Sequence, residues 1–415
     1  MSRRILFAPF GSEGDVNPLI WLGKLLAARG HRVEFLISPH YAPRARKHGF
    51  LCHDLGTEED FHRLASDPAL WHPLRGTWRV ARAMHQSLPA CRAAFEAAGS
   101  GFDLLVTSSF ALGASALAEA RGIPRLMLHL QPMVLRSHRD MPVPGPGAGW
   151  FPQAPKLFQD AAFGVVDAVL NRTMLPPLND FRASLGLPRL GDFYRDALMR
   201  SDAVALLFPD WFAPPQPDWP PGVHQFDFPL EVPAVADLPD ALRDWLDSGP
   251  PPVLWTHGSA NVHLRQAQEL ALHVTRKIGG RALLVGRVAP EFPLSDALFH
   301  CPAVPFEDVF PRCRAVVHHG GIGTTSKAFA AGIPQMILPL AHDQHDNAAR
   351  VARLRAGVEG RPCVRDASRK LGQILESPDI AEGVARCRSL ASRSPARAAE
   401  LAEFAEALAN NSDRR

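Results

Sequence analysis

The strongest constraint on the fold is a repeated pattern in which an apolar run of strand length leads through a loop into a helix and then into another apolar run. The first copy lies at residues 3–38, where RRILFAPF, GSEGDVNP, LIWLGKLLAARG and HRVEFLIS follow one another and Gly30 ends the helix. Residues 102–130 repeat the pattern. Such units build parallel sheets, so the N-terminal half is predicted to be an α/β domain.

The pattern stops in a proline-rich stretch, which includes FPDWFAPPQPDWPPG, and then restarts with PVLWTHGSA, RALLVG, RAVVHHGG and IPQMILPL. A length of 415 residues suits two domains of about 200 residues each. We therefore expect two doubly wound parallel-sheet domains. The predicted division is an N-terminal domain at 1–215, a linker at 216–252, a C-terminal domain at 253–395, and a C-terminal helix and tail at 396–415.

Composition narrows the classes of function. The chain is 46% hydrophobic and 21% charged, and its net charge of +3 is spread among both signs, so no nucleic-acid partner is expected. The six cysteines have neither C-x-x-C spacing nor a compact framework, and the N-terminus lacks a signal-peptide core, so a cytoplasmic protein is expected. No stretch is apolar enough to span a bilayer, which leaves peripheral membrane contact open.

The most informative segment is AVVHHGGIGTTSKAFAAGIPQMILPLAHDQHDN at 315–347, where an apolar strand enters a glycine turn that opens a helix. Glycines let a ligand approach the backbone, and the free N–H groups of a helix N-terminus favour an anion, so this turn predicts a phosphate site. The alternative is a simple strand-to-helix turn. The residues assigned to the site are His318, His319, Gly320, Gly321, Gly323, Thr324 and Thr325.

The next predicted strand ends beside the same sheet edge and delivers a polar group of side chains, among them Asp343, Gln344 and Asn347. Asp343 and Gln344 can accept from and donate to sugar hydroxyls. The alternative is that Asp343 only caps a helix.

The run from His318 to Asn347 resembles the donor-binding signature of the family 1 glycosyltransferases of GT-B fold, with its H-x-G-G-x-G-T-T and D-Q elements. The segments LFPDWFAPPQPDWPP and DPALWHP are similar to those of bacterial rhamnosyltransferases of rhamnolipid synthesis. The resemblance implies two Rossmann-like domains facing across a cleft. It also implies that the glycine turn holds the diphosphate of a nucleotide sugar, the co-substrate, while Asp343 and Gln344 hold its sugar.

The resemblance further implies that Gly258 and Ser259 touch the phosphates, although a serine capping a helix is the alternative. It implies that the backbone of Val304 reads the edge of the base. Ala303 stands where relatives often have a stacking ring, so either Phe306 compensates or the base is held more weakly, and uracil and thymine both stay open.

The catalytic base is predicted to be Asp15, in the loop GSEGDVNP directly after the first strand. Many relatives carry a histidine in this loop, and a carboxylate serves as the base in a subgroup of them. The base would remove the acceptor proton during a single inverting displacement. The alternative is that Asp15 caps a helix that begins near Asn17 or Pro18. Because the chain contains no D-x-D and no recognisable histidine spacing, no metal and no further cofactor is expected.

A lipophilic acceptor pocket is predicted in the insertion at residues 57–98 and in the loop near Ser109, although packing in the core is the alternative for each side chain. The candidates are Phe61, Trp78, Met84 and Phe110. The favoured reaction is rhamnosyl transfer from a thymidine diphosphate sugar to a hydroxy fatty acid ester. The alternatives are a glucosyltransferase acting on a sterol, polyketide or other aglycone, a GT-B epimerase, and a non-catalytic nucleotide-sugar-binding subunit or sensor.

Overall fold

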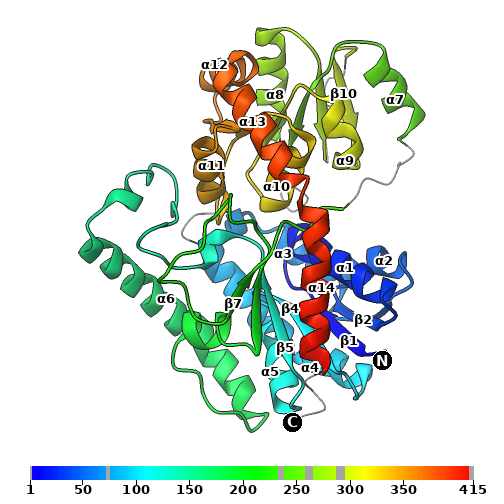
Figure 1. The fold of residues 1–415 in the computed structure, drawn as a ribbon, viewed down its shortest axis with the longest axis vertical. Coiled ribbons are helices and arrows are strands. Elements are labelled where there is room, and N and C mark those ends of the chain that lie inside the picture. The colour runs from blue at the N-terminus through cyan, green and yellow to red at the C-terminus, as the bar shows by residue number, and fades with distance from the viewer. Residues whose placement is uncertain (1, 72–74, 232–237, 258–264, 287–294, 411–415) are drawn as a thin grey trace. The chain divides into compact units, whose positions relative to one another are not determined.

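The computed structural model describes residues 2–71, 75–231, 238–257, 265–286 and 295–410. The chain divides into two compact units, each containing one sheet (Figure 1). Unit 1 comprises Met1–Pro142, Trp150–Pro229 and Ala396–Arg415, and unit 2 comprises Val143–Gly149 and Leu230–Pro395.

Unit 1 is built on a sheet of seven parallel strands in the order β3-β2-β1-β4-β5-β6-β7. The strands are β1 (Arg4–Ala8), β2 (Arg32–Ile37), β3 (Leu51–Asp54), β4 (Leu104–Ser108), β5 (Arg125–His129), β6 (Ala203–Leu206) and β7 (Val223–Gln225). The central strands are buried along nearly their whole length, as expected for a parallel sheet covered on both faces. The order reverses between β1 and β4, and open sheets of this kind bind ligands at the carboxyl ends of the strands near such a reversal.

The helices of unit 1 follow its strands in sequence. They are α1 (Glu13–Ala28), α2 (Ala42–Arg46), α3 (Glu58–Ala65), α4 (Gly76–Ala98), α5 (Leu112–Ala120) and α6 (Lys156–Ala183). Stacked rings of Phe7 and Phe35, with centroids 5.1 Å apart, join β1 to β2 within the core. The helix α4 packs against α5 and α6.

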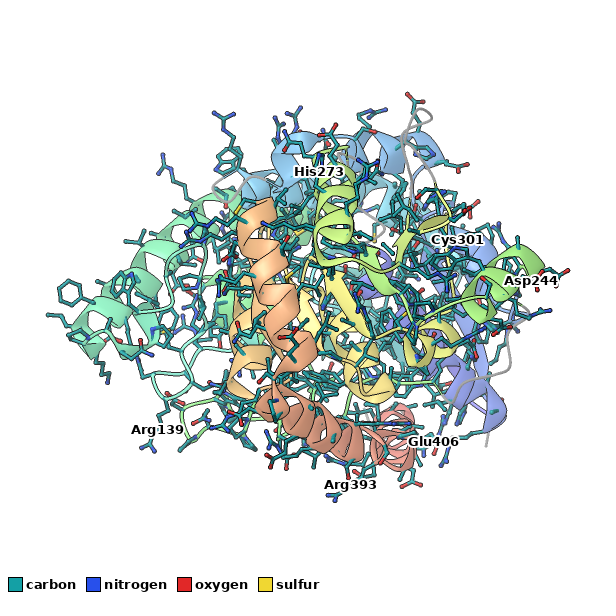
Figure 2. All side chains as sticks on the ribbon, turned by 90° about the horizontal axis from the view of Figure 1, so that it is seen from above. Arg139, Asp244, His273, Cys301, Arg393 and Glu406 are labelled. Atoms are coloured by element: carbon teal, nitrogen blue, oxygen red, sulfur yellow. The ribbon has the colours of Figure 1, made fainter. Side chains whose placement is uncertain are left out.

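The last helix, α14 (Ser394–Asn410), runs alongside unit 1 (Figure 1). Glu406, labelled in Figure 2, receives hydrogen bonds from Arg29 Nε at 2.6 Å and contacts His31 Nε2 at 2.8 Å. Phe404 contacts the ring of Phe226, with centroids 5.5 Å apart, next to the edge strand β7. The helix therefore contacts unit 1 both beside the edge strand β7 and at the end of α1.

Unit 2 is built on six parallel strands in the order β10-β9-β8-β11-β12-β13. The strands are β8 (Val253–Thr256), β9 (Ala282–Val285), β10 (Leu298–Cys301), β11 (Ala315–His318), β12 (Gln335–Ile337) and β13 (Gly357–Glu359). The helices are α7 (Asp240–Asp247), α8 (Arg265–Ile278), α9 (Phe306–Val309), α10 (Ile322–Ala331), α11 (Gln344–Arg353), α12 (Val364–Glu376) and α13 (Pro378–Ala391). The order reverses between β8 and β11, so both predicted doubly wound sheets are confirmed.

The units differ from the predicted division in three places, the first being residues Val143–Gly149, which group with unit 2. The expected linker at 216–252 supplies β7 to unit 1 and α7 to unit 2, because a short edge strand tolerates neighbouring prolines. The C-terminal residues from Ala396 group with unit 1 instead of standing apart. Within the described residues, no helix is long and apolar enough to cross a membrane.

Candidate active site

The glycine-rich turn of unit 2 joins the end of β11 to α10, at the strand where the order of the sheet reverses. Gly320 has a φ of +97°, and a Cβ there would lie 2.8 Å from Ile337 Cγ2 and 3.1 Å from the carbonyl oxygen of Gln344. Only glycine fits this conformation and this space. The turn therefore packs directly against the start of α11.

The N-terminus of α10 is open. Its N-cap is Gly321, and among the described residues no side chain caps the first turn, which contains no acidic residue. The amide of Thr325 donates to the carbonyl of Gly321 at 3.0 Å, so the preceding amides of the first turn lie before the first helical hydrogen bond. Gly323 is exposed and Thr324 is half-buried. Free amides and the helix dipole make this end a site for an anion.

Two residues assigned to the diphosphate lie inside the protein instead. Thr325 is fully buried, and its Oγ1 donates to the carbonyl of Gly321 at 3.0 Å. His318 is also fully buried, and its Nδ1 accepts from the Gly320 amide at 3.2 Å. The other ring nitrogen then carries the proton and donates to Gln335 Oε1 at 3.0 Å. Both side chains support the turn, so direct contact with a phosphate does not fit their geometry.

His319, which was also assigned to the diphosphate, lies nearer the surface than His318. It is half-buried, and a Cβ on Gly321 would lie 2.6 Å from its Nε2, so the ring leans over the start of α10. Its Nδ1 is buried without a hydrogen-bond partner among the described residues. Burial, followed by the nearby histidines 318 and 257, lowers the pKa of His319 to about 3, so the ring is neutral at pH 7.

His257 is a residue that the sequence analysis did not single out. It follows β8 directly, and β8 pairs with β11 so that Thr256 lies opposite His318. Burial lowers the pKa of His257 to about 4. Its charge would also affect the pKa values of His318 and His319, which places all three rings at one sheet edge. A partial signal was available: each of these two apolar strands has a histidine at its end or directly after it.

The two motifs of unit 2 are joined by Asn347. This residue is fully buried, and its Nδ2 donates to the carbonyl of Gly320 at 2.9 Å and to Asp343 Oδ2 at 2.7 Å. Asp343 is half-buried at the N-cap of α11 but makes no side-chain cap hydrogen bond there. Gln344 is buried, and its Oε1 accepts from the amides of Leu340 and Ala341 at 2.7 and 3.1 Å. Asp343 thus remains accessible, while the Gln344 oxygen shapes the loop.

The residues assigned to the base lie where α9 begins. Phe306 stacks on Phe310 with ring centroids 4.5 Å apart, and Val304 packs against the same hydrophobic cluster. Both side chains are half-buried, which leaves part of the Phe306 ring accessible. Gly258 and Ser259, assigned to the phosphates, lie outside the described residues.

In unit 1, Asp15 lies in the first turn of α1, directly after β1 at the reversal of the sheet. Its Oδ2 accepts from the amide of Ser12 at 2.8 Å and from its hydroxyl at 3.1 Å, which forms a capping box. The helix begins at Glu13 and not near Asn17 or Pro18. Burial raises the pKa of Asp15, and the hydrogen bonds from Ser12 oppose this rise. The helix cap and the predicted base are therefore the same side chain, and its pKa is raised.

The loop after β4 is tied to neighbouring strands by serine hydroxyls. Ser108 Oγ accepts from the amide of Phe10 at 2.8 Å, which fixes the end of β1. Ser109 Oγ lies 2.8 Å from Nδ1 of His129, whose Nε2 contacts the carbonyl of Leu198 at 3.0 Å. Burial lowers the pKa of His129 to about 4, so this buried pair is neutral at pH 7. These contacts hold the edge of the sheet that carries Asp15.

The four side chains assigned to the acceptor lie in different surroundings. Met84 is buried in the core, whereas Trp78 is 62% exposed. Phe110 lines a small cavity together with Phe10 and other residues, and Phe61 stacks on His40 with centroids 3.8 Å apart. Core packing, the alternative, fits Met84 best. Phe61 and Phe110 keep a place near the carboxyl edge of the sheet.

Histidine spacing predicted no metal ligands, but the structure brings three candidates together in unit 1. His40, Glu58 and His62 place one ligand atom each within 4.8 Å of one another. The sequence interval of 18 residues between the loop and α3 hides this group, because only the fold brings the two segments together.

The comparisons with known proteins cover both units. Residues 5–137 match the glycosyltransferase family 28 N-terminal domain, and residues 293–408 match the C-terminal domain of erythromycin biosynthesis protein CIII-like proteins. Glycosyltransferase GtfE of Amycolatopsis orientalis is 31% identical over 363 residues, covering 86% of this chain and 85% of GtfE.

Two solved structures show the same fold. The glycotransferase of kitacinnamycin superposes with a TM-score of 0.74 at 19% identity, covering 98% of this chain and 99% of its own. The spinosyn rhamnosyltransferase SpnG, complexed with thymidine diphosphate, gives 0.66 at 19% identity, covering 97% and 99%. The chain therefore belongs to the glycosyltransferases of GT-B fold that combine a family 28 N-terminal domain with an EryCIII-like C-terminal domain.

Proposed function

We propose that this glycosyltransferase moves a hexose, with inversion, from a nucleoside diphosphate sugar to a hydroxyl of a lipophilic small molecule. The observation that carries the proposal is the open N-terminus of α10, beneath the neutral ring of His319 and linked through Asn347 to the accessible Asp343. Such a group offers donors to a diphosphate and an acceptor to a sugar hydroxyl. The groups that would bind the diphosphate and the sugar all belong to unit 2.

The proposed reaction is a single displacement at the anomeric carbon. The acceptor oxygen forms the new bond to this carbon as the bond to the diphosphate oxygen breaks, and Asp15 takes the proton of the acceptor hydroxyl. The diphosphate leaves with the electron pair of the broken bond. The amides at the start of α10 and the ring of His319 stabilise the charge that develops on it. No metal or further cofactor is assigned to this step.

The favoured donor is a thymidine diphosphate rhamnose, and the favoured acceptor is a hydroxy fatty acid ester. Support for the base comes from SpnG, whose structure holds thymidine diphosphate, and support for the sugar comes from its name as a rhamnosyltransferase. Ala303 is exposed beside Val304. The second candidate donor is UDP-glucose, with a polyketide, sterol or other aglycone as its acceptor.

The experiment incubates purified protein with dTDP-rhamnose or UDP-glucose and follows release of the nucleoside diphosphate, with and without a panel of hydroxy fatty acid esters and aglycones. We expect release that depends on both dTDP-rhamnose and an acceptor. Release with UDP-glucose alone among donors would reject the rhamnosyl assignment. Binding without release under every condition would leave the enzyme class unsupported and favour a sugar-binding subunit.

The role of Asp15 is tested by Asp15→Asn. Turnover should fall by roughly 10²- to 10⁴-fold, the usual contribution of a general base, while affinity for the nucleotide sugar stays within a few-fold. Asp60→Asn is the matched control, because Asp60 forms an equivalent capping box with Thr57 on α3. Unchanged turnover in Asp15→Asn would remove this residue from the mechanism.

A further inference from the structure

Three side chains that can bind a metal converge at the carboxyl edge of the sheet of unit 1. His40 follows β2 in the loop before α2, while Glu58 and His62 lie one turn apart on the same face of α3. Glu58 Oε1 is 3.8 Å from His40 Nδ1 and 3.7 Å from His62 Nε2. All three ligand atoms lie within 4.8 Å of one another.

These separations are too long for hydrogen bonds, and among the described residues none of the three ligand atoms makes one. They are close to the spacing of ligands around a single ion. With metal-to-ligand distances of about 2.0–2.2 Å in a tetrahedral shell, neighbouring ligand atoms are roughly 3.3–3.5 Å apart. Glu58 Oε1 is therefore within about half an ångström of this spacing from each histidine nitrogen, and the two histidine nitrogens lie within 4.8 Å of each other.

The position of His40 is set before any ion binds. Its ring stacks on Phe61 at 3.8 Å with an interplanar angle of 11°, and it meets the edge of Tyr41 at 4.9 Å. The neighbouring cation, Arg44, is paired with Glu13, which offsets its repulsion of a metal ion. One of the three ligands is thus oriented by packing, which reduces the entropy lost on binding.

We propose that His40, Glu58 and His62 bind a divalent transition metal of the zinc class, with the fourth position open to water. Two imidazoles and one carboxylate form a donor set that suits Zn²⁺ or Co²⁺, whereas Mg²⁺ prefers oxygen ligands and keeps several waters. The site is separate from the glycine turn of unit 2 and does not depend on the proposed reaction.

The ion would act as a staple. None of the eight residues of α3 is buried, and Phe61 supplies its ring contacts to His40 and Tyr41. A metal bonded to His40 on one side and to Glu58 and His62 on the other ties α3 to the loop after β2. The helix also carries Phe61, a predicted acceptor contact, so the ion would strengthen a link that the His40–Phe61 stack already makes.

The test uses the full-length protein without an affinity tag, stripped with a chelator and desalted. Titration with Co²⁺, followed by its visible absorption and by calorimetry, should give one tight site per chain, and Mg²⁺ should not compete. The variants His62→Ala and Glu58→Gln should weaken Co²⁺ binding by at least roughly 10- to 100-fold, since even the loss of an outer partner costs that much. Zn²⁺ should raise the Tm of the wild-type protein and should not raise it in these variants.

The matched controls are Glu59→Gln, on the same helix with its side chain 84% exposed, and His273→Ala, on the surface of α8 (Figure 2). Both should bind Co²⁺ within twofold of wild type. Circular dichroism and the Tm without metal show whether each variant folds. Binding of equal strength in wild type, His62→Ala and Glu58→Gln would place the ion elsewhere and overturn the proposal, and so would the absence of Co²⁺ binding at millimolar concentration.

Discussion

Asp15 caps a helix and is the proposed catalytic base, and these two roles make different demands on its carboxylate. As part of a capping box it accepts hydrogen bonds from Ser12, which favour the charged form, whereas burial favours the neutral form. The net pKa is raised, so the carboxylate is a stronger base than an exposed aspartate. The same hydrogen bonds keep the carboxylate oriented, so the cap also holds the proposed base in place.

This balance predicts a pH dependence. A general base must be deprotonated, so kcat/KM should fall as the pH drops through the raised pKa of Asp15, above its ordinary value of 3.8. Ser12→Ala removes a hydrogen bond to the charged carboxylate, so the pKa should rise further. The acid limb of the pH–rate profile should then move to higher pH.

Steady-state kinetics from pH 4 to 9 on wild type and Ser12→Ala measure this shift. Thr57→Ala makes the equivalent change in the capping box of α3 and should leave the acid limb where it is. If Ser12→Ala moved the limb to lower pH or not at all, another group would be the base.

The glycines of the turn make separable contributions. Gly320→Ala introduces a side chain at φ +97° against the carbonyl of Gln344, and it should lower the free energy of unfolding by about 1–3 kcal/mol and weaken nucleotide diphosphate binding. Gly323→Ala meets no heavy atom within 4 Å in the described structure and should keep or slightly raise stability. Gly323→Ala should still weaken nucleotide diphosphate binding, because the methyl group lies at the uncapped N-terminus of α10.

Urea unfolding and calorimetry with thymidine diphosphate measure both effects on the two variants. Equal loss of stability in Gly320→Ala and Gly323→Ala would contradict the assignment of close packing to Gly320 alone. Unchanged binding in Gly323→Ala would show that the diphosphate does not approach this turn.

At the level of single residues, sequence reasoning located the glycine turn but could not tell which histidine of the pair lies inside the protein. The pattern H-H-G-G does not say which histidine points inward, because that depends on the pairing of β11 with β12, which supplies Gln335 as the partner of His318. His257 was missed for the same reason: its neighbours come from another strand. Glycine turns and helix ends can be predicted from neighbouring residues, whereas the direction of a side chain depends on which strands pair in the sheet.

At the level of elements, the strands and helices around both reversals were predictable because each combines an apolar run with a glycine or proline that ends it. The strand β7 and the helix α7 were not, since prolines surround them and the segment reads as a linker. The docking of α14 was also beyond prediction. Its alanine-rich sequence indicates a helix but carries no signal for the surface that it covers.

The contact between α14 and the end of α1 predicts an effect of pH on stability. The hydrogen bond from Arg29, followed by that from His31, lowers the pKa of Glu406 to about 2 from its ordinary 4.5. A carboxyl group with a lowered pKa stabilises the fold above its unfolded pKa, and this stabilisation is lost as the pH falls from 4.5 toward 2. Glu406→Gln should therefore lower the Tm at pH 7 by about 1–3 °C, because the pair is partly exposed.

The Tm difference between wild type and Glu406→Gln should shrink below pH 4.5 and at high salt, as scanning calorimetry can record. Glu403→Gln is the control, because Glu403 is 64% exposed and lies 3.8 Å from Arg29. A Tm difference that grew on acidification would mean that Glu406 acts by packing and not by charge.

At the scale of the whole molecule, the chain passes more than once between the two units, so they are not two successive domains. Residues Val143–Gly149 leave unit 1 to join unit 2, where the Val143 amide donates to Asp346 Oδ1 at 3.2 Å, and α14 returns to unit 1 at the end. Each unit is therefore assembled from separated segments. The sequence predicts two successive domains, because no local pattern shows that a later segment packs on an earlier unit.

This course predicts where a C-terminal truncation acts. Ending the chain after Arg393 removes α14, including the buried Leu401 and the contact of Phe404 with Phe226, and so uncovers the β7 edge of unit 1. Hydrogen exchange should then speed up in β6, β7 and the end of α1, while the amides of α10 and β11 in unit 2 keep their protection. Nucleotide diphosphate binding should survive, and acceptor-dependent turnover should fall.

A second truncation after Asn410 removes none of these contacts and should behave as wild type. If the chain that ends after Arg393 lost protection first in α10 and β11, α14 would stabilise unit 2. The division into the two units would then be wrong.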